Sequence, residues 1–308
     1  MDSAIKIVHT MPSFIQKNLQ HDTAQLSATL ALDTSTARIE VQCLLQHALQ
    51  VSRAYLIAHP EYVLSDTEQT QYSSMLQRRL HGEPLAYILG GREFFGLNFQ
   101  VNSATLIPRA DTELLVEKAL QIIPKNTASN LSESIYSVLD LGTGSGAIAL
   151  SIAHHRPHIQ VVACDFSADA LQVARENARH LNLNNIIFTH SDWYAALGNQ
   201  HFDLIVSNPP YIAADDPHLQ MGDLRFEPYT ALAAGADGLQ DIRQIIAGAH
   251  AHLKPQGQLW LEHGYNQAAS VREILQQAGL HNIYSERDLA GIERISGATL
   301  GATFGAMR

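Results

Sequence analysis

The strongest constraint on the fold is an alternation of apolar, strand-like runs with helical stretches, which begins near residue 136 of this 308-residue chain. Alternation of strand and helix at this spacing is typical of a parallel sheet with helices on both faces. We predict strands at 136–141, 160–165, 186–189, 202–207 and 258–262, and helices at 147–155, 168–181, 238–253 and 267–278. Ligands of such sheets bind outside the carboxyl ends of the strands, so the residues that follow each strand are the candidates for a functional site.

The first 90 residues follow a different pattern, in which helical periodicity dominates and strand-like runs are absent. From Ala37 to Leu49, apolar side chains recur at the spacing of one helix face. Ser65 and Glu68 have the form of a capping box that opens another helix. We therefore predict a small helical bundle domain over residues 1–90.

The segment after this bundle is predicted to connect it to the α/β part. Residues 91–108 contain an aromatic, β-branched run with a glycine, which favours a β-hairpin linker, and the α/β domain then covers 109–308. Asp111 is expected to cap a helix that runs to about Gln121. The polar segment 125–134 is predicted to be an exposed loop.

Composition excludes several classes of protein. The net charge of −10, with acidic residues in excess in both parts, argues against stable nucleic-acid binding. The first residues lack the pattern of a secretory signal, and no apolar stretch approaches the length of about 20 residues that a membrane helix needs. Cys43 and Cys164 stand far apart in apolar surroundings, as buried thiols of a reducing compartment do. We expect a cytoplasmic protein without membrane contact, and by default a monomer.

The turn Asn208-Pro209-Pro210-Tyr211 directly follows the predicted strand 202–207. Two prolines end both strand and helix and remove two backbone donors, so they leave a rigid turn with exposed carbonyls beside a side-chain amide. Such an acceptor pair beside an aromatic ring suits a planar group that carries an NH2. The alternative is a turn that only terminates the strand.

A glycine-rich loop, Asp140-Leu-Gly-Thr-Gly-Ser-Gly146, follows the first predicted strand and precedes a helix. Glycines let the backbone turn tightly and approach a ligand at a helix N-terminus. The loop also fits a dinucleotide fingerprint, with Asp165 in the place of the acid that binds a ribose. Asp140 and the pair Asp192-Trp193 favour S-adenosylmethionine, because a carboxylate suits a cationic ligand and an acid beside an aromatic suits adenine. As alternatives, Asp140 caps the loop, Asp165 caps a helix and Trp193 only packs.

Taken together, these segments resemble the release-factor glutamine methyltransferases (the PrmC or HemK family) within the class I methyltransferases. The resemblance rests on Gly91-Arg-Glu-Phe-Phe95, Leu106-Ile-Pro-Arg-Ala-Asp-Thr-Glu113, the glycine loop, Asn208-Pro-Pro-Tyr211, Arg225-Phe-Glu-Pro228 and Asp288-Leu-Ala-Gly-Ile-Glu-Arg294. Ala110 departs from the family, which usually has proline after the arginine.

The resemblance implies an α/β, Rossmann-like fold with a mostly parallel seven-stranded sheet and an N-terminal helical domain that recognises the substrate. It implies methyl transfer from S-adenosylmethionine to the glutamine of the Gly-Gly-Gln motif in class I peptide chain release factors. The products are then N5-methylglutamine and S-adenosylhomocysteine.

The resemblance also implies roles for individual residues. Asn208, Pro209 and Tyr211 are expected to be catalytic, and Asn208 to Tyr211 with Arg225 and Glu227 to bind the substrate. A structural ion pair is the alternative for the last two. The expected cofactor-binding residues are Asp140, Gly142, Thr143, Gly144, Ser145, Gly146, Asp165, Asp192, Trp193 and Asn208, with Arg109, Asp111 and Glu113 bordering the pocket.

Other functions are weaker interpretations of the same residues. An amino methyltransferase of DNA or RNA shares the Asn-Pro-Pro-Tyr motif but lacks support from the charge. A dehydrogenase would not explain the Asn-Pro-Pro-Tyr motif. A non-catalytic adapter would explain neither this motif nor the glycine-rich loop beside it. We expect no metal, because Pro157 interrupts the histidine run His154-His155-x-x-His158 and no matching ligand set is present.

Overall fold

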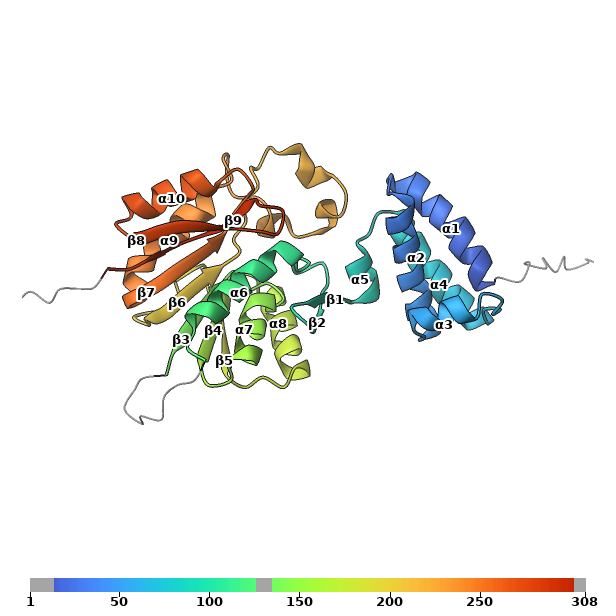
Figure 1. The fold of residues 1–308 in the computed structure, drawn as a ribbon, viewed down its shortest axis with the longest axis horizontal. Coiled ribbons are helices and arrows are strands. Elements are labelled where there is room, and N and C mark those ends of the chain that lie inside the picture. Colours follow the sequence, from blue (N-terminus) through green and yellow to red (C-terminus); the bar gives the residue numbers. More distant parts are fainter. Residues whose placement is uncertain (1–13, 126–134, 302–308) are drawn as a thin grey trace, which may run out of the picture. The chain divides into compact units, whose positions relative to one another are not determined.

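The computed structural model describes residues 14–125 and 135–301, and the chain divides into two compact units, Met1–Leu89 and Gly90–Arg308 (Figure 1). Of the predicted loop 125–134, all but Lys125 lies outside the described residues. Within those residues, no helix combines the length and the apolar character needed to cross a membrane.

The described residues of the first unit are mainly helical. Its helices are α1 (Ile15–Leu30), α2 (Thr34–Leu49), α3 (Arg53–Ala58), α4 (Asp66–Leu80) and α5 (Leu85–Leu89). The predicted capping box is present: the Ser65 hydroxyl accepts from the Glu68 amide, and the Glu68 carboxylate accepts from the Ser65 amide at 2.7 Å. Apolar faces of these helices form one core, which includes the fully buried Leu44 and Leu45.

The second unit opens with an antiparallel pair, β1 (Gly91–Phe94) and β2 (Leu97–Gln100), followed by the 3₁₀ turn η1 (Ala110–Thr112) and α6 (Glu113–Ile122). The predicted helix cap at Asp111 is wrong. Asp111 lies inside the 3₁₀ turn, and α6 begins at Glu113 without a side-chain cap. The Asp111 carboxylate pairs with the Arg294 guanidinium at 3.2 Å instead, because the tight turn shifts the helix start past it.

A seven-stranded sheet in the order β5-β4-β3-β6-β7-β9-β8 forms the body of this unit. Its elements in chain order are β3 (Ser137–Leu141), α7 (Ala147–His155), β4 (Gln160–Asp165), α8 (Ala168–His180), β5 (Ile186–His190), β6 (Phe202–Ser207), α9 (Gln240–His252), β7 (Leu253–Glu262), α10 (Ala268–Gln277), β8 (His281–Arg287) and β9 (Glu293–Thr299). Six of the seven strands run in one direction, and β9 runs antiparallel between β7 and β8. The predicted α/β fold, with its mostly parallel sheet and helical N-terminal part, is confirmed.

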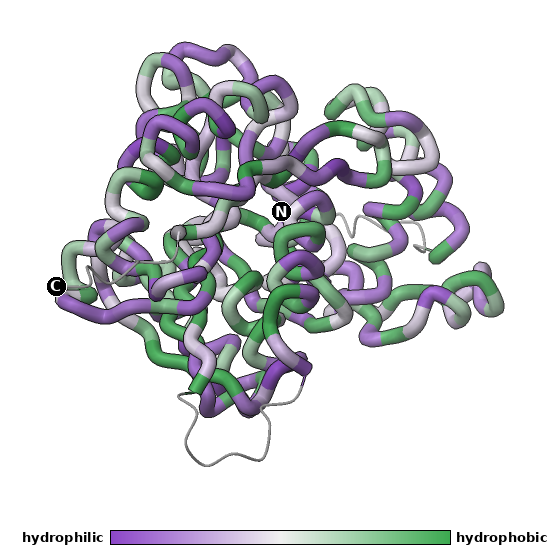
Figure 2. Tube along the Cα trace, turned by 60° about the vertical axis from the view of Figure 1, so that its left-hand side comes forward, coloured by the Kyte–Doolittle hydropathy of each residue, from purple (hydrophilic) through white to green (hydrophobic). Residues whose placement is uncertain are grey.

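The sheet buries both of its faces. Helices α6, α7 and α8 pack on one face, and α9 and α10 on the other (Figure 1). Neighbouring residues alternate between the two cores, as Val138 and Leu139 of β3 do. Along the helices in Figure 2 the tube changes repeatedly between green and purple, as one buried and one exposed face require.

Strands β8 and β9 were not among the predicted strands. Polar and charged residues dominate β8, which lies at the sheet edge. In β9, Gly297 lowers the strand propensity, yet it is required there: a β-carbon at this position lies 2.3 Å from the buried Trp260 ring.

Between β6 and α9, the long loop after Tyr211 contains only short 3₁₀ turns, at Pro217–Gln220, Leu224–Phe226 and Tyr229–Ala231. Ile212 and Ala233 form a β-bridge that closes its base. The loop therefore returns to the end of β6, beside the acceptor turn.

Candidate active site

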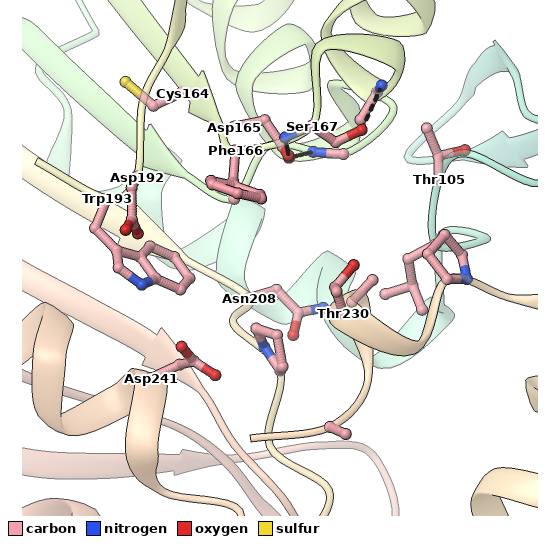
Figure 3. Close-up of a pocket in the computed structure, with 18 of the residues that line it drawn as sticks. Thr105, Cys164, Asp165, Phe166, Ser167, Asp192, Trp193, Asn208, Thr230 and Asp241 are labelled. Atoms are coloured by element: carbon pink, nitrogen blue, oxygen red, sulfur yellow. Dashed lines mark hydrogen bonds between the residues drawn. The ribbon is translucent and has the colours of Figure 1, made fainter. Parts of the chain in front are cut away.

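A cavity of about 430 Å³ lies at the carboxyl ends of the parallel strands, within the second unit. In Figure 3, Phe166, Trp193 and Asn208 surround the same open space. Of the residues expected from the sequence, those that line the cavity are Gly142, Gly144, Asp165, Asp192, Trp193, Asn208 and Pro210. They lie at or directly after the ends of β3, β4, β5 and β6, so the ends of neighbouring strands meet at one site.

The backbone N–H groups of the glycine loop donate hydrogen bonds to the end of β4. The Gly144 N–H donates to Asp165 Oδ2 at 2.8 Å, and the Thr143 N–H donates to the Cys164 carbonyl at 2.9 Å. Gly146 has φ +85°, and a β-carbon there lies 2.8 Å from the Leu150 side chain. Only glycine fits this position, which lets the loop enter α7 directly.

Asp140 supports the loop from behind and does not line the cavity. Its side chain is fully buried and accepts a hydrogen bond of 2.7 Å from the Thr143 hydroxyl. Burial raises the pKa of the Asp140 carboxyl to about 7. Thr143, Ser145 and Gly146 also lie outside the cavity lining, so the geometry favours the loop-capping alternative for Asp140.

The aromatic side of the cavity is built around Trp193. Its ring lies against Gly142: a β-carbon added at this glycine would be 3.5 Å from Trp193 Cζ3. Asp241 also lines this side, and burial raises the pKa of its carboxyl while the nearby indole of Trp193 lowers it. Phe166 is 70% exposed at the edge, so an aromatic surface and acidic acceptors face one space.

Several residues of the lining were not predicted, among them Thr105, Phe166, Thr230 and Asp241. Phe166 directly follows the predicted strand 160–165, so its position after a strand end was enough to predict it as a site residue. Asp241 stands in the first turn of α9, Thr230 lies in the 3₁₀ turn Tyr229–Ala231, and Thr105 lies in an irregular segment. No motif marks these three.

The acceptor turn is held from several directions. The Asn208 Nδ2 donates to Thr112 Oγ1 at 3.1 Å, while Asn208 Oδ1 has no donor within the described part of the chain. The Gln267 Nε2 donates to the Tyr211 carbonyl at 3.0 Å. The Tyr211 hydroxyl donates to Glu262 Oε1 at 3.4 Å, and burial raises the pKa of this phenol. Asn208 and Pro210 line the cavity, whereas Pro209 and Tyr211 do not.

Arg225 and Glu227 lie outside the lining. The buried Glu227 carboxylate accepts from the Ile107 amide at 3.0 Å and pairs with the Arg109 guanidinium. Burial raises the pKa of Glu227. This pair ties the loop after Tyr211 to the segment before η1, which favours the structural alternative for Glu227. The Arg225 guanidinium lies over the Phe226 ring, 5.0 Å from its centre.

The charged residues around η1 also lie outside the cavity lining. Arg109 and Asp111 form the ion pairs described above, and the Glu113 carboxylate accepts from the Phe95 amide at 3.0 Å. Elsewhere, His155 and His158 bond to backbone carbonyls, and the described ranges contain no cluster of metal-ligating side chains.

Comparison with known proteins places both units in one family. The PrmC N-terminal domain matches residues 23–90, and the methyltransferase small domain matches residues 118–224. The release factor glutamine methyltransferase of Xylella fastidiosa (strain Temecula1) is 49% identical over 84% of this chain and 92% of its own length. That of Escherichia coli (strain K12) is 44% identical over 85% of this chain and 92% of its own.

Among solved structures, the hMettl16 catalytic domain with a MAT2A 3'UTR hairpin gives a TM-score of 0.51 at 16% identity. It covers 78% of this chain and 84% of that one. This likeness concerns the fold alone. With relatives this similar over most of both chains, the chain belongs to the release factor glutamine methyltransferase family.

Proposed function

We propose that this chain transfers a methyl group from S-adenosylmethionine to the side-chain amide nitrogen of the glutamine in the Gly-Gly-Gln motif of class I peptide chain release factors. The products are N5-methylglutamine and S-adenosylhomocysteine. The observation that carries the proposal is the Asn208 amide on the cavity wall, with its Nδ2 engaged by Thr112 and its Oδ1 left to accept from a substrate. The names of the relatives agree with this substrate.

The residues around the cavity fit S-adenosylmethionine. Gly142 and Gly144 bring bare backbone to the wall, Asp165 and Asp192 offer carboxylates to hydroxyl and amino groups, and Trp193 offers a ring face. The orphan Oδ1 of Asp140 lies under the same loop, in reach of no donor among the described side chains. When bound, this cofactor supplies an electrophilic methyl group on a sulfonium.

The turn at the end of β6 compensates for the weak nucleophilicity of an amide. Its lone pair is delocalised, and positive charge grows on the NH2 group as it attacks. Asn208 Oδ1 and the Pro209 carbonyl each accept one N–H, so they direct the nitrogen and stabilise the growing charge. No general base is required beforehand, because the nitrogen becomes strongly acidic once it is methylated.

The role of Tyr211 concerns the turn itself. From the sequence we expected this residue to be catalytic and to bind the substrate, but its hydroxyl donates to Glu262 Oε1 and its ring packs against the core that includes α9. We now propose that Tyr211 anchors the turn while Pro210 faces the cavity.

The remaining proposals concern the partner. We propose that the helical unit, which matches the PrmC N-terminal domain, recognises the release factor, and that the enzyme acts as a cytoplasmic monomer. An Ile57→Asp change on its exposed surface should then raise KM for the release factor and leave the Kd for S-adenosylmethionine unchanged. An unchanged KM would point to another face of the unit.

The test is transfer of labelled methyl from S-adenosylmethionine, offered in parallel to purified release factor and to duplex DNA. We expect label on the release factor, lost when the glutamine of its Gly-Gly-Gln motif is replaced. Label on DNA alone would contradict the proposed substrate but retain the site. No label on either would contradict the proposal altogether.

A further inference from the structure

Thr112 and Glu262 lie in line behind the Asn208 amide, although nothing in the sequence links the three residues. The Thr112 hydroxyl accepts the Asn208 Nδ2–H at 3.1 Å. Thr112 also lies near enough to the Glu262 carboxyl to lower its pKa, and the Tyr211 hydroxyl donates to Glu262 Oε1 at 3.4 Å. Thr112 is 4% exposed and Glu262 is 2% exposed, so water does not compete for these groups.

The donors and acceptors of Glu262, Thr112 and Asn208 favour one orientation of the Asn208 amide. A threonine hydroxyl carries one proton, and a buried carboxylate only accepts hydrogen bonds. Once the Thr112 proton points to Glu262, the hydroxyl offers Asn208 only a lone pair. Asn208 must then turn its NH2 toward Thr112, which leaves Oδ1 for the substrate. The opposite orientation of the amide would present two donors to the substrate NH2 and repel it.

Charged side chains and the sheet hold Glu262 in place. The Arg294 guanidinium pairs with Asp111 at 3.2 Å and with Asp288 at 2.8 Å, and it lies close enough to stabilise a charge on Glu262. Glu262 itself ends β7, next to β6 in the sheet, so backbone pairing fixes its distance from the acceptor turn.

We propose that Thr112 and Glu262 are positioning residues, which fix the Asn208 amide with its oxygen toward the acceptor nitrogen. Neither residue touches the reacting atoms. This inference rests on the proposed function, because it gives Asn208 the role of accepting from the substrate amide.

The first test separates positioning from folding. Thr112→Val removes the hydroxyl at nearly constant volume, and we expect kcat to fall about 10- to 100-fold. KM for the release factor and Kd for S-adenosylmethionine should change less than about threefold, and Thr112→Ser should restore kcat. The matched control is Thr23→Val, which removes a buried hydroxyl in the helical unit that has no hydrogen-bond partner there. A Thr112→Val variant with native kcat would overturn the proposal.

The second test asks whether Thr112 acts through Asn208. In an Asn208→Ala background, Thr112→Val should cause little further loss, because the group that it positions is already gone. A fully additive loss in the double variant would show that Thr112 acts by another route, and the proposal would fall.

The third test needs no substrate. In protein labelled with ¹⁵N-asparagine, the Asn208 side-chain amide is the signal missing from Asn208→Ala. We expect one of its protons to shift upfield in Thr112→Val and to keep its native position in Thr112→Ser. An unchanged signal in Thr112→Val would overturn the inference. If the native enzyme fails to methylate the release factor, the proposed function fails, and this signal still decides whether Thr112 holds the amide.

Discussion

The glycine loop and the acceptor turn stand at adjacent strand ends of the same sheet, yet they are built by different means. Leu141 at the end of β3 pairs with Ser207 at the end of β6, so the two segments begin side by side. The loop is shaped by glycine conformations and by hydrogen bonds that its own backbone N–H groups donate, one of them to the Asp165 carboxylate. The turn is held by side chains from Thr112, Glu262 and Gln267, which come from three distant segments.

This difference has consequences for what each region tolerates. A loop made of backbone fails when a side chain is added, because its φ angles and close contacts leave no room. A turn held by side chains fails when a donor or acceptor is removed, because a buried partner is left unpaired. Substitutions in the two regions should therefore produce different losses, stability in the loop and rate in the turn.

The largest expected effect is in the turn. Asn208→Ala removes the side-chain acceptor, and kcat for release-factor methylation should fall about 10²–10³-fold, or about 3–4 kcal/mol. The midpoint of denaturant unfolding should change little, since Asn208 is only half-buried. A variant that keeps full methyl transfer would contradict the role given to Asn208.

The next largest expected effect is a pH dependence of the free energy of unfolding, which arises from Glu262. Burial raises its pKa to about 7, with Asp111 raising and Thr112, Tyr211 and Arg294 lowering it. The native state therefore binds a proton that the unfolded chain, near 4.5, has released. This contribution to the free energy of unfolding is fully present below pH 4.5 and is lost as pH rises to about 7, by about 3 kcal/mol.

The comparison of native protein with Glu262→Gln isolates this group, because the raised pKa of Asp140 is common to both. The difference between their unfolding free energies should fall over this pH window. The native rate should rise over the same window, because only the ionised carboxylate accepts from both hydroxyls, and the variant should lack this step. Parallel profiles for the two proteins would exclude Glu262 as the titrating group.

In the loop, Gly146→Ala and Gly144→Ala form a matched pair. Both positions have positive φ, but a β-carbon meets Leu150 at 2.8 Å only at Gly146, and it meets nothing within 4 Å at Gly144. Each change costs about 1 kcal/mol in backbone strain, and overpacking adds about 2 kcal/mol at Gly146. Chemical denaturation without cofactor measures the difference. Equal losses at both positions would mean that Leu150 moves aside.

The smallest expected effect concerns the aromatic wall. Trp193→Phe keeps an aromatic ring but removes the indole N–H near Asp241, so the Kd for S-adenosylmethionine should rise about fivefold, or about 1 kcal/mol. Isothermal titration calorimetry measures this Kd. No change in Kd would show that the indole N–H does not shape the ligand site.

The same contrast explains what the sequence alone could predict. Regular periodicity located α2, the helices of the α/β part and five of its strands, and turn chemistry located Gly142–Gly146 and Asn208–Tyr211, because these signals are local. Thr112, Glu262 and Asp241 gain their roles only when the sheet brings distant segments together, and no local pattern reports that. Strands β8 and β9 were not predicted because a polar edge and an interior glycine conceal their periodicity.

The most direct test of the account is a crystal structure of the enzyme with S-adenosylhomocysteine and a release-factor domain that carries Gly-Gly-Gln. We predict that the glutamine amide nitrogen lies within about 3.2 Å of both Asn208 Oδ1 and the Pro209 carbonyl, with Asn208 Nδ2 still on Thr112. A glutamine nitrogen bonded to other acceptors, or an Asn208 amide turned the opposite way, would contradict it.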